Sequence, residues 1–345
     1  MLTLAATHRT LADGRDLWFF DLPGHRVAPV PDRRPLPAQP ATPSDLRFDR
    51  RTGQWVVIAA LRQERTYKPP PDQCPLCPGP TGMTSEIPAP DYDVAVFENR
   101  FASLSAANNG RCEVVCFTSE HTGSFAGLQS RKARLVVDVW RERTRDLMSR
   151  PGIEQVFVFE NRGEEIGVTL THPHGQIYGY PYLPPTTESM LAAADAHRKA
   201  NGSNLFADLL ADEVADGSRV ILATGSVTAL VPFAARWPVE VHIYPNRKVR
   251  NLLELDDAEL DDLTAVYQQI LQRFDRMYAA PLPYMAALHQ YTDSEAQREG
   301  YFHIQVISIR RSATKLKYLA GSESVMGAFI NDVVPEALAD TLRGL

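Results

Sequence analysis

The sequence has no apolar run that approaches the length needed to span a bilayer. Its first 20 residues include Arg9, Asp13 and Arg15, and they lack the continuous apolar core of a secretory signal peptide. We therefore expect a cytoplasmic protein with no membrane partner. In that compartment cysteines are expected to stay reduced, so disulfides are not expected.

An excess of positive charge is also missing. The 345 residues carry 36 Lys and Arg against 42 Asp and Glu, which gives a net charge of −6. A general nucleic-acid binder needs a basic surface, so nucleic acid is not an expected partner. Phosphates would have to be bound by a local cluster of arginine, lysine and backbone N–H groups. The length suits two domains or two packed halves.

Cysteine is scarce, and two of the four form a C-x-x-C motif. Cys74 and Cys77 lie in a turn-rich, proline-rich loop, where two thiolates at this spacing can share one Zn²⁺. The best-placed further ligands are His121 and His172. Together they predict a closed Cys₂His₂ site, which is a structural rather than a catalytic type of zinc site.

Two alternatives to this zinc site remain open. Cys112 and Cys116 would complete a Cys₄ site, but they fall within a regular strand with Val114 between them, which favours small core residues. The C-x-x-C is otherwise a pair of reduced loop cysteines without a metal.

Proline and strand patterns divide the chain. Pro29–Pro43 is too rich in proline for a helix or a central strand, and it predicts an extended arm or linker. Leu46–Leu61 predicts a hairpin that turns at Thr52 and Gly53, with a buried strand over Trp55–Ala60. The expected parts are an N-terminal arm, 1–45, and two halves, 46–185 and 186–345.

Each half contains a strand, a long amphipathic helix and a strand that carries histidine. In the first half these segments are Arg111–Thr118, Arg131–Arg150 and Gly167–Pro181. In the second half they are Val239–Tyr244, Asp256–Tyr278 and Tyr301–Ile309. The repetition predicts an α+β fold made by internal duplication. The alternative is two unrelated α+β segments of similar texture.

The motif H-P-H-G-Q in the first half gives the strongest indication of a catalytic site. His172 and His174 are two residues apart, so a strand would place them on one side. Gly175 allows a close approach of backbone or phosphate, and Gln176 can donate to phosphate oxygens without adding charge. A neutral imidazole is a competent nucleophile near neutral pH, and its attack on phosphorus gives a phosphoramidate. The alternative is a pair of packed structural histidines.

Several motifs in order resemble the galactose-1-phosphate uridylyltransferase family of the histidine-triad superfamily. The resemblance runs from about Leu46 to about Gly321. It includes T-G-Q-W-V-V-I, C-P-L-C, V-F-E-N-R-F, F-T-S-E-H, V-F-E-N-R-G, H-P-H-G-Q, W-P-V-E and R-S-A-T-K-L-K-Y. The implied fold is two histidine-triad-like halves, each a mostly antiparallel half-barrel sheet with helices packed on it.

The resemblance implies a two-step transfer of UMP. His174 would attack the α-phosphorus of UDP-glucose and release glucose 1-phosphate, and galactose 1-phosphate would then take the UMP group from the histidine. Gln176 would hold the phosphoryl oxygens. The other implied substrate-binding residues are Asn161 and Thr169 near the α-phosphate, Asn99 in the uridine pocket, and Arg62, Arg65, Lys317, Tyr318 and Glu323.

The resemblance also bears on assembly and metals. The arginine pair and the segment around Lys317 would reach the site of a neighbouring subunit, so a homodimer is expected. Cys74, Cys77, His121 and His172 match the family's zinc ligands. A second metal, iron in many members, would use Glu188, His289 and His303, but its fourth position is Gln305 here.

Two other functions fit parts of the pattern. Ser322 replaces an aromatic residue near the sugar site, so the sugar end of the fingerprint is weaker than the nucleotide end. One alternative is therefore a nucleoside-diphosphate-sugar phosphorylase, such as a relative of ADP-glucose phosphorylase, which would use phosphate as the acceptor. The other is a zinc-stabilised nucleotide-binding protein without catalysis.

Overall fold

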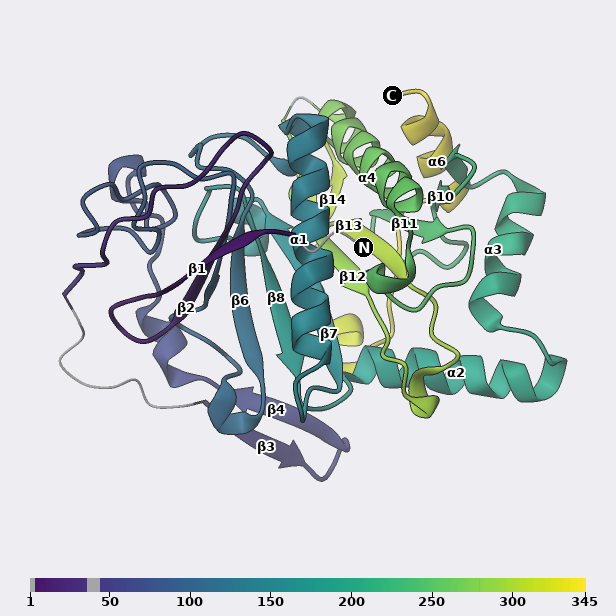
Figure 1. Cartoon of the computed structure of the whole chain (residues 1–345). Coiled ribbons are helices and arrows are strands. Elements are labelled where there is room, and N and C mark those ends of the chain that lie inside the picture. The colour runs from purple at the N-terminus through teal and green to yellow at the C-terminus, as the bar shows by residue number, and fades with distance from the viewer. Residues whose placement is uncertain (1–3, 36–43, 279) are drawn as a thin grey trace. The chain divides into compact units, whose positions relative to one another are not determined.

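The chain folds into two units in this computed structural model, which describes residues 4–35, 44–278 and 280–345. Unit 1 comprises Met1–Val158 and Thr169–Glu188, and unit 2 comprises Phe159–Val168 and Ser189–Leu345. Residues 36–43 of the expected linker lie outside the described residues. Each unit contains an antiparallel sheet with a long helix packed on it (Figure 1).

The sheet of unit 1 has the order β1-β2-β5-β6-β8, and β7 lies next to β8. Each pair from β1 to β8 is antiparallel. The bounds are β1 Ala6–Thr10, β2 Asp16–Phe20, β5 Val94–Glu98, β6 Arg111–Cys116, β7 Gln155–Arg162 and β8 His174–Tyr180. A separate hairpin pairs β3 (Asp45–Asp49) with β4 (Gln54–Ile58), and Gly53 makes its turn with a φ of 70°.

Helix α1 (Ser130–Met148) covers the sheet of unit 1. Its Leu135, Val139 and Trp140 recur at helical spacing and are buried, as the sequence pattern predicts. Helix α1 contacts β5 and β8, so it supports the strand that carries H-P-H-G-Q. Short 3₁₀ turns complete the unit at Ala60–Glu64, Pro71–Gln73, Ala106–Asn108 and Phe125–Gly127.

The sheet of unit 2 has the order β12-β13-β11-β10-β9. Its strands are β9 Val220–Ala223, β10 Val227–Leu230, β11 Val239–Pro245, β12 Tyr284–His289 and β13 His303–Ser308. A two-stranded ribbon of β14 (Arg310–Ser312) and β15 (Lys315–Leu316) follows. Helix α2 (Pro185–Asn201) begins in unit 1 and continues in unit 2, and the other helices of unit 2 are α3 Leu205–Asp216, α4 Asp257–Met277, α5 Gly321–Met326 and α6 Pro335–Arg343.

Helix α4 begins with a capping box. The Asp256 side chain accepts from the backbone of Glu259, and the Glu259 side chain accepts from the backbone of Asp256, at 2.9 Å each. The helix then packs on β10 and β11. Short 3₁₀ turns lie at Glu164–Ile166, Leu252–Glu254 and Glu295–Gln297.

The two units share one topology, which agrees with an internal duplication. In unit 1, which holds Gln155–Val158 of β7, the strands lie in the order β5-β6-β8-β7, and α1 comes between β6 and β7 in the chain. In unit 2 the order is β10-β11-β13-β12, and α4 comes between β11 and β12. Each of these four strands therefore has a counterpart at the same place, and the predicted α+β class is confirmed.

Three local features differ from the sequence-based expectations. Strand β8 starts at His174 rather than near Gly167, so His172 precedes the strand. Trp55 and Ile58 of β4 are 43% and 41% exposed, although the sequence predicts a buried strand there. The expected N-terminal arm forms β1 and β2, and β2 pairs with β5 in the sheet.

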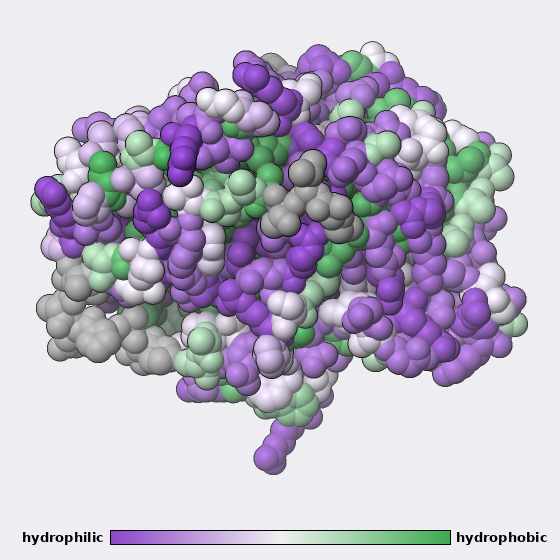
Figure 2. All heavy atoms as spheres, viewed as in Figure 1, coloured by the Kyte–Doolittle hydropathy of each residue, from purple (hydrophilic) through white to green (hydrophobic). Residues whose placement is uncertain are grey.

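The surface of the described residues is mixed in polarity. On the face shown in Figure 2, hydrophilic residues predominate and hydrophobic residues gather in small groups. Among the described residues, none of the helices has the length and apolar character needed to cross a membrane.

Candidate active site and metal centre

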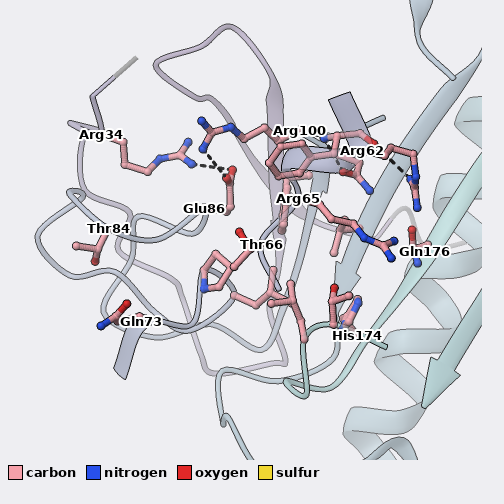
Figure 3. A pocket seen from close by; sticks show the side chains of 18 residues that line it. Arg34, Arg62, Arg65, Thr66, Gln73, Thr84, Glu86, Arg100, His174 and Gln176 are labelled. Atoms are coloured by element: carbon pink, nitrogen blue, oxygen red, sulfur yellow. Dashed lines mark hydrogen bonds and ion pairs between the residues drawn. The ribbon is translucent and has the colours of Figure 1, made fainter. Parts of the chain in front are cut away.

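A cavity of about 310 Å³ in unit 1 contains the predicted nucleophile (Figure 3). His174 and Gln176 of β8 lie at one end, together with Arg62 and Arg65. The other polar lining residues are Arg34, Thr66, Gln73, Thr84, Glu86, Asn99, Arg100 and Thr169. The predicted residues of unit 1 therefore share one cavity, and its arginines suit a phosphorylated ligand.

The hydrogen bonding of His174 leaves one ring nitrogen available. Its Nδ1 lies 2.8 Å from the carbonyl oxygen of His172, and because a carbonyl can only accept, Nδ1 carries the proton. Burial lowers the pKa of His174, so the ring is neutral near pH 7. The neutral ring keeps a lone pair on Nε2, which is the atom needed to attack phosphorus.

Strand pairing places Gln176 beside His174. Both project from the same face of β8, where they pair with Cys116 and Val114 of β6. The Gln176 Oε1 accepts from the hydroxyl of Tyr178 at 3.4 Å, which leaves the amide Nε2 as a donor. An amide donor next to a nucleophilic ring can stabilise charge that develops on phosphoryl oxygens.

The arginine pair follows β4: Arg62 lies within the 3₁₀ turn Ala60–Glu64, and Arg65 follows its end. Arg62 donates to the Ser103 hydroxyl at 3.0 Å and to the carbonyl of Phe101 at 3.3 Å. These bonds fix its guanidinium at the cavity, and Arg65 lines the same cavity. In this chain both arginines therefore lie on the same unit as His174.

Asn99 and Thr169 line the cavity as well. The Asn99 Oδ1 accepts from the backbone N–H of Phe101 at 2.9 Å, so its Nδ2 is oriented as a donor. The carbonyl of Thr169 accepts from the backbone of Lys68 at 2.9 Å, which ties the loop before β8 to the loop after Arg65.

Arg34, Glu86 and Arg100 also line the cavity, and sequence reasoning missed them. Arg34 lies in the proline-rich segment, where no motif marks it. Glu86 follows the C-x-x-C loop, and Arg100 adjoins Asn99. A charged residue next to a motif residue was the available signal for Arg100, whereas Arg34 and Glu86 meet only through the tertiary fold.

The predicted metal ligands come together beside this cavity. The ligand atoms of Cys74, Cys77, His121 and His172 all lie within 4.8 Å of one another. The Cys77 Sγ is 3.3 Å from Nδ1 of His121 and 3.5 Å from Nδ1 of His172. Two thiols and two imidazoles in this arrangement fit a four-coordinate metal such as zinc.

Surrounding groups orient His172 for coordination. Its Nε2 donates to the carbonyl of Thr118 at 2.8 Å, so Nδ1 bears the lone pair that faces Cys77. Burial lowers the pKa of His172 to about 4, which keeps the ring neutral. The carbonyl of the same residue holds His174, so the metal cluster and the nucleophile share one backbone segment.

The alternative Cys₄ site is not formed among the described residues. Cys112 and Cys116 are fully buried in β6, as the strand pattern predicts, and neither belongs to the cluster of metal ligands. Burial raises the pKa of the Cys112 thiol to about 11, which is typical of an inert core cysteine.

The remaining predicted substrate residues belong to unit 2. Lys317 and Glu323 form an ion pair of 2.6 Å, and both are buried. Tyr318 is 72% exposed. Asn161 lies in β7, on the unit 2 side of the boundary. Their contacts with substrate therefore stay predictions.

Histidines gather in unit 2 as well. The rings of His289 and His303 stack with centroids 4.5 Å apart. Gln305 donates to Glu240 at 2.8 Å, so its Oε1 faces His289 Nε2, 3.0 Å away, as an acceptor. That nitrogen then carries a proton and does not present a lone pair to a metal. Glu188 belongs to unit 1, and the second metal site stays a prediction.

The sequence and the fold match those of nucleotidyltransferases. The family model described as galactose-1-phosphate uridyl transferase, N-terminal domain, matches residues 38–109 and 105–184, and the model of its C-terminal domain matches residues 191–345. The chain belongs to the galactose-1-phosphate uridylyltransferase family.

Individual relatives agree with this assignment. A galactose-1-phosphate uridylyltransferase of Streptomyces lividans is 46% identical over 348 residues, which cover 98% of this chain and 97% of the relative. One of Thermotoga maritima is 35% identical and covers 87% of this chain and 98% of its own length. A solved uridylyltransferase structure is 29% identical with a TM-score of 0.78, covering 87% of this chain and 97% of that one.

A further solved structure shares the fold alone. It is an ADP-glucose phosphorylase from Arabidopsis thaliana with bound ADP-glucose, 23% identical with a TM-score of 0.69. It covers 88% of this chain and 99% of the other chain.

Proposed function

We propose that this protein transfers UMP from UDP-glucose to galactose 1-phosphate through a covalent intermediate on His174. The observation that carries the proposal is the Nδ1 hydrogen bond to the His172 carbonyl, which leaves the Nε2 lone pair in a cavity lined by arginines. The family membership supports the choice of substrates.

In the first half-reaction the Nε2 lone pair attacks the α-phosphorus. A phosphorus–nitrogen bond forms, and the bond from phosphorus to the oxygen of glucose 1-phosphate breaks. The leaving group departs as a phosphate anion and needs no proton. The ring becomes cationic, and the Nδ1–H bond to the carbonyl of His172 stabilises that charge.

In the second half-reaction a phosphate oxygen of galactose 1-phosphate attacks the same phosphorus. The phosphorus–nitrogen bond breaks, and the electron pair returns to Nε2. Gln176 donates to the phosphoryl oxygens in both steps, and Arg62 and Arg65 bind the charge of the phosphates.

We further propose that the cluster of Cys74, Cys77, His121 and His172 holds zinc in a structural role. All four ligands are supplied by the protein, so the metal would have no open position for substrate. Its effect on catalysis would be to fix the His172 carbonyl and thereby the ring of His174. Reduced thiols at this cluster fit a cytoplasmic location.

A homodimer is part of the proposal. The β3–β4 hairpin presents Phe48, Trp55, Val56 and Ile58 with exposed fractions of 41% to 50%. Such a group of apolar side chains is typical of an interaction surface. Light scattering on the purified protein tests this, and a monomer at micromolar concentration would contradict it.

A labelling experiment tests the transfer itself. The protein is incubated with UDP-glucose and analysed by mass spectrometry of the intact chain and its peptides. We expect one UMP adduct on His174 and its removal by galactose 1-phosphate. The variant His174→Ala should show no adduct, whereas His8→Ala, an exposed histidine paired with Asp16, should label normally.

Other outcomes of this experiment identify the alternatives. Removal of the adduct by inorganic phosphate but not by galactose 1-phosphate would indicate a phosphorylase. Binding of UDP-glucose without any adduct at high protein concentration would indicate a nucleotide-binding protein without catalysis.

A further inference from the structure

Glu86 is the one carboxylate among the described residues that line the cavity. Its side chain is about 90% buried, and arginines surround it (Figure 3). A cavity for a phosphorylated ligand gains affinity from arginine, but a carboxylate repels phosphate. The position of Glu86 therefore requires a reason other than phosphate binding.

The surroundings of Glu86 hold it in one place. Its Oε2 accepts from Arg15 at 2.5 Å and from Arg34 at 2.7 Å. Arg34 is itself held by Asp32 through bonds of 2.9 and 2.8 Å. On the other oxygen, Oε1, the nearest guanidinium nitrogen of Arg100 is 3.9 Å away. Oε2 is thus saturated, and Oε1 keeps lone pairs for a ligand.

A carboxylate oxygen accepts hydrogen bonds, so the ligand must present donors at this point. Phosphate oxygens at neutral pH are acceptors, and this excludes the phosphates of a nucleotide sugar. Its remaining donors are the hydroxyls of the ribose and the hexose and the N–H of the base.

The neighbouring residues favour the ribose. Asn99 precedes Arg100 in the chain and lines the cavity, and its Oδ1 accepts from the Phe101 backbone, which leaves Nδ2 as the donor of the amide. Phe97 and Leu76 add apolar surface to the same cavity, which suits a nucleobase. His174 and Gln176 lie at the other end, where phosphorus would be. Ribose is the group that joins base to phosphate.

We propose that Glu86 is a specificity-determining residue that accepts hydrogen bonds from the ribose hydroxyls of the donor. The site would then select ribonucleotide donors against their 2′-deoxy analogues. The inference rests on the proposed function, because it takes the ligand to be a nucleotide sugar. The arginines hold the carboxylate oriented for this contact.

The test compares UDP-glucose with its 2′-deoxyuridine analogue as donors. The wild-type kcat/KM should favour the ribose form by roughly tenfold or more, the typical value of a hydrogen bond to a charged group. The variant Glu86→Gln should reduce that preference toward unity. Asp13→Asn is the matched control, because Asp13 pairs with Arg15 in the same arginine cluster without lining the cavity. It should keep the wild-type preference.

Three results would overturn the inference. One is an equal loss of kcat/KM with both donors in Glu86→Gln, which would mean that Glu86 only balances the charge of the arginines. Another is a wild-type enzyme that does not distinguish the two donors. The third is a change in Glu86→Gln that is confined to a donor with a 2-deoxyhexose, which would place the hexose at Glu86.

Calorimetry separates this inference from the proposed function. The affinities of the wild-type protein for UMP and 2′-deoxy-UMP are measured. This measurement depends neither on UMP transfer nor on the folding of a variant. If the protein binds UMP more tightly than 2′-deoxy-UMP but transfers no UMP, the contact with the ribose hydroxyls is upheld and the proposed transferase activity is refuted. If the protein transfers UMP but binds UMP and 2′-deoxy-UMP equally well, the transferase activity is upheld and the role of Glu86 is refuted.

Discussion

Replacing the buried carboxylate of Glu160 should change how stability depends on pH. Glu160 is 4% exposed in unit 2, immediately before Asn161. The hydroxyls of Tyr284 and Tyr267 donate to it at 2.8 and 3.3 Å. Burial raises its pKa from 4.5 to about 7, and the two tyrosines only partly offset that rise.

The sign of the effect follows from proton counting. Between pH 4.5 and about 7 the folded protein retains a proton that the unfolded chain releases. The free energy of unfolding therefore falls as pH rises through this window. A pKa rise from 4.5 to about 7 corresponds to a loss of about 3 kcal/mol at about 1.4 kcal/mol per pH unit.

The variant Glu160→Gln has no titrating proton at this position. Relative to wild type, it should gain up to about 3 kcal/mol between about pH 4.5 and about pH 8. Urea unfolding at several pH values measures the gap between the two proteins. Glu295→Gln is the control, because the Glu295 side chain is 80% exposed. A gap for Glu160→Gln that stays constant with pH would refute the reasoning.

Three further predictions concern the metal cluster, the buried ion pair between β6 and α1, and the Gln176 amide that donates to the phosphoryl oxygens. Cys77→Ser should lower the metal content measured by elemental analysis, whereas Cys112→Ser should leave it near one per chain; equal metal in both would contradict the site. Glu113→Ala should cost about 2–3 kcal/mol in urea unfolding, because the buried Arg143 loses its bonds of 2.8 and 2.9 Å to Glu113 and keeps Asp146, at 2.7 Å. Gln176→Ala should lower kcat by about a hundredfold without a change in urea midpoint; an unchanged kcat would remove its role.

Much of the fold is predictable from local pattern. Helices α1 and α4 carry long amphipathic repeats, and both form within two residues of the predicted ends. The similar order of strands in the two halves is also visible, because each half repeats a strand, a helix and a histidine-bearing strand. These features depend on spacing within one segment, which is what a sequence displays.

Burial depends on partners, and here the pattern was misleading. The run around Trp55 is apolar and β-branched, so it predicts a buried strand, yet in this chain β4 pairs only with β3 among the described residues and stays exposed. An apolar pattern indicates that a surface is to be covered, but it does not show whether the same chain or another one covers it.

The start of β8 shows a second limit. Period-two alternation predicts that His172 and His174 share one strand face, but the strand begins at His174. Pro173 has no N–H for a sheet ladder, and the ring of His172 is held by the Thr118 carbonyl and faces Cys77. Long-range contacts with the metal cluster override the local alternation.

The cavity was only partly predictable for the same reason. The motif residues His174, Gln176 and Asn99 lie in recognisable strings. Arg34 and Glu86 are separated by 52 positions in the sequence and form an ion pair of 2.7 Å in the structure. A single sequence carries no sign of that contact.

The central claim is that His174 carries the UMP group. Its most direct test is peptide mass spectrometry of the protein after exposure to UDP-glucose alone. We expect a single adduct of one UMP, placed on the peptide with H-P-H-G-Q, labile in acid and lost on addition of galactose 1-phosphate. Turnover that proceeds at the normal rate in His174→Ala, or a UMP adduct on another residue, would contradict the account.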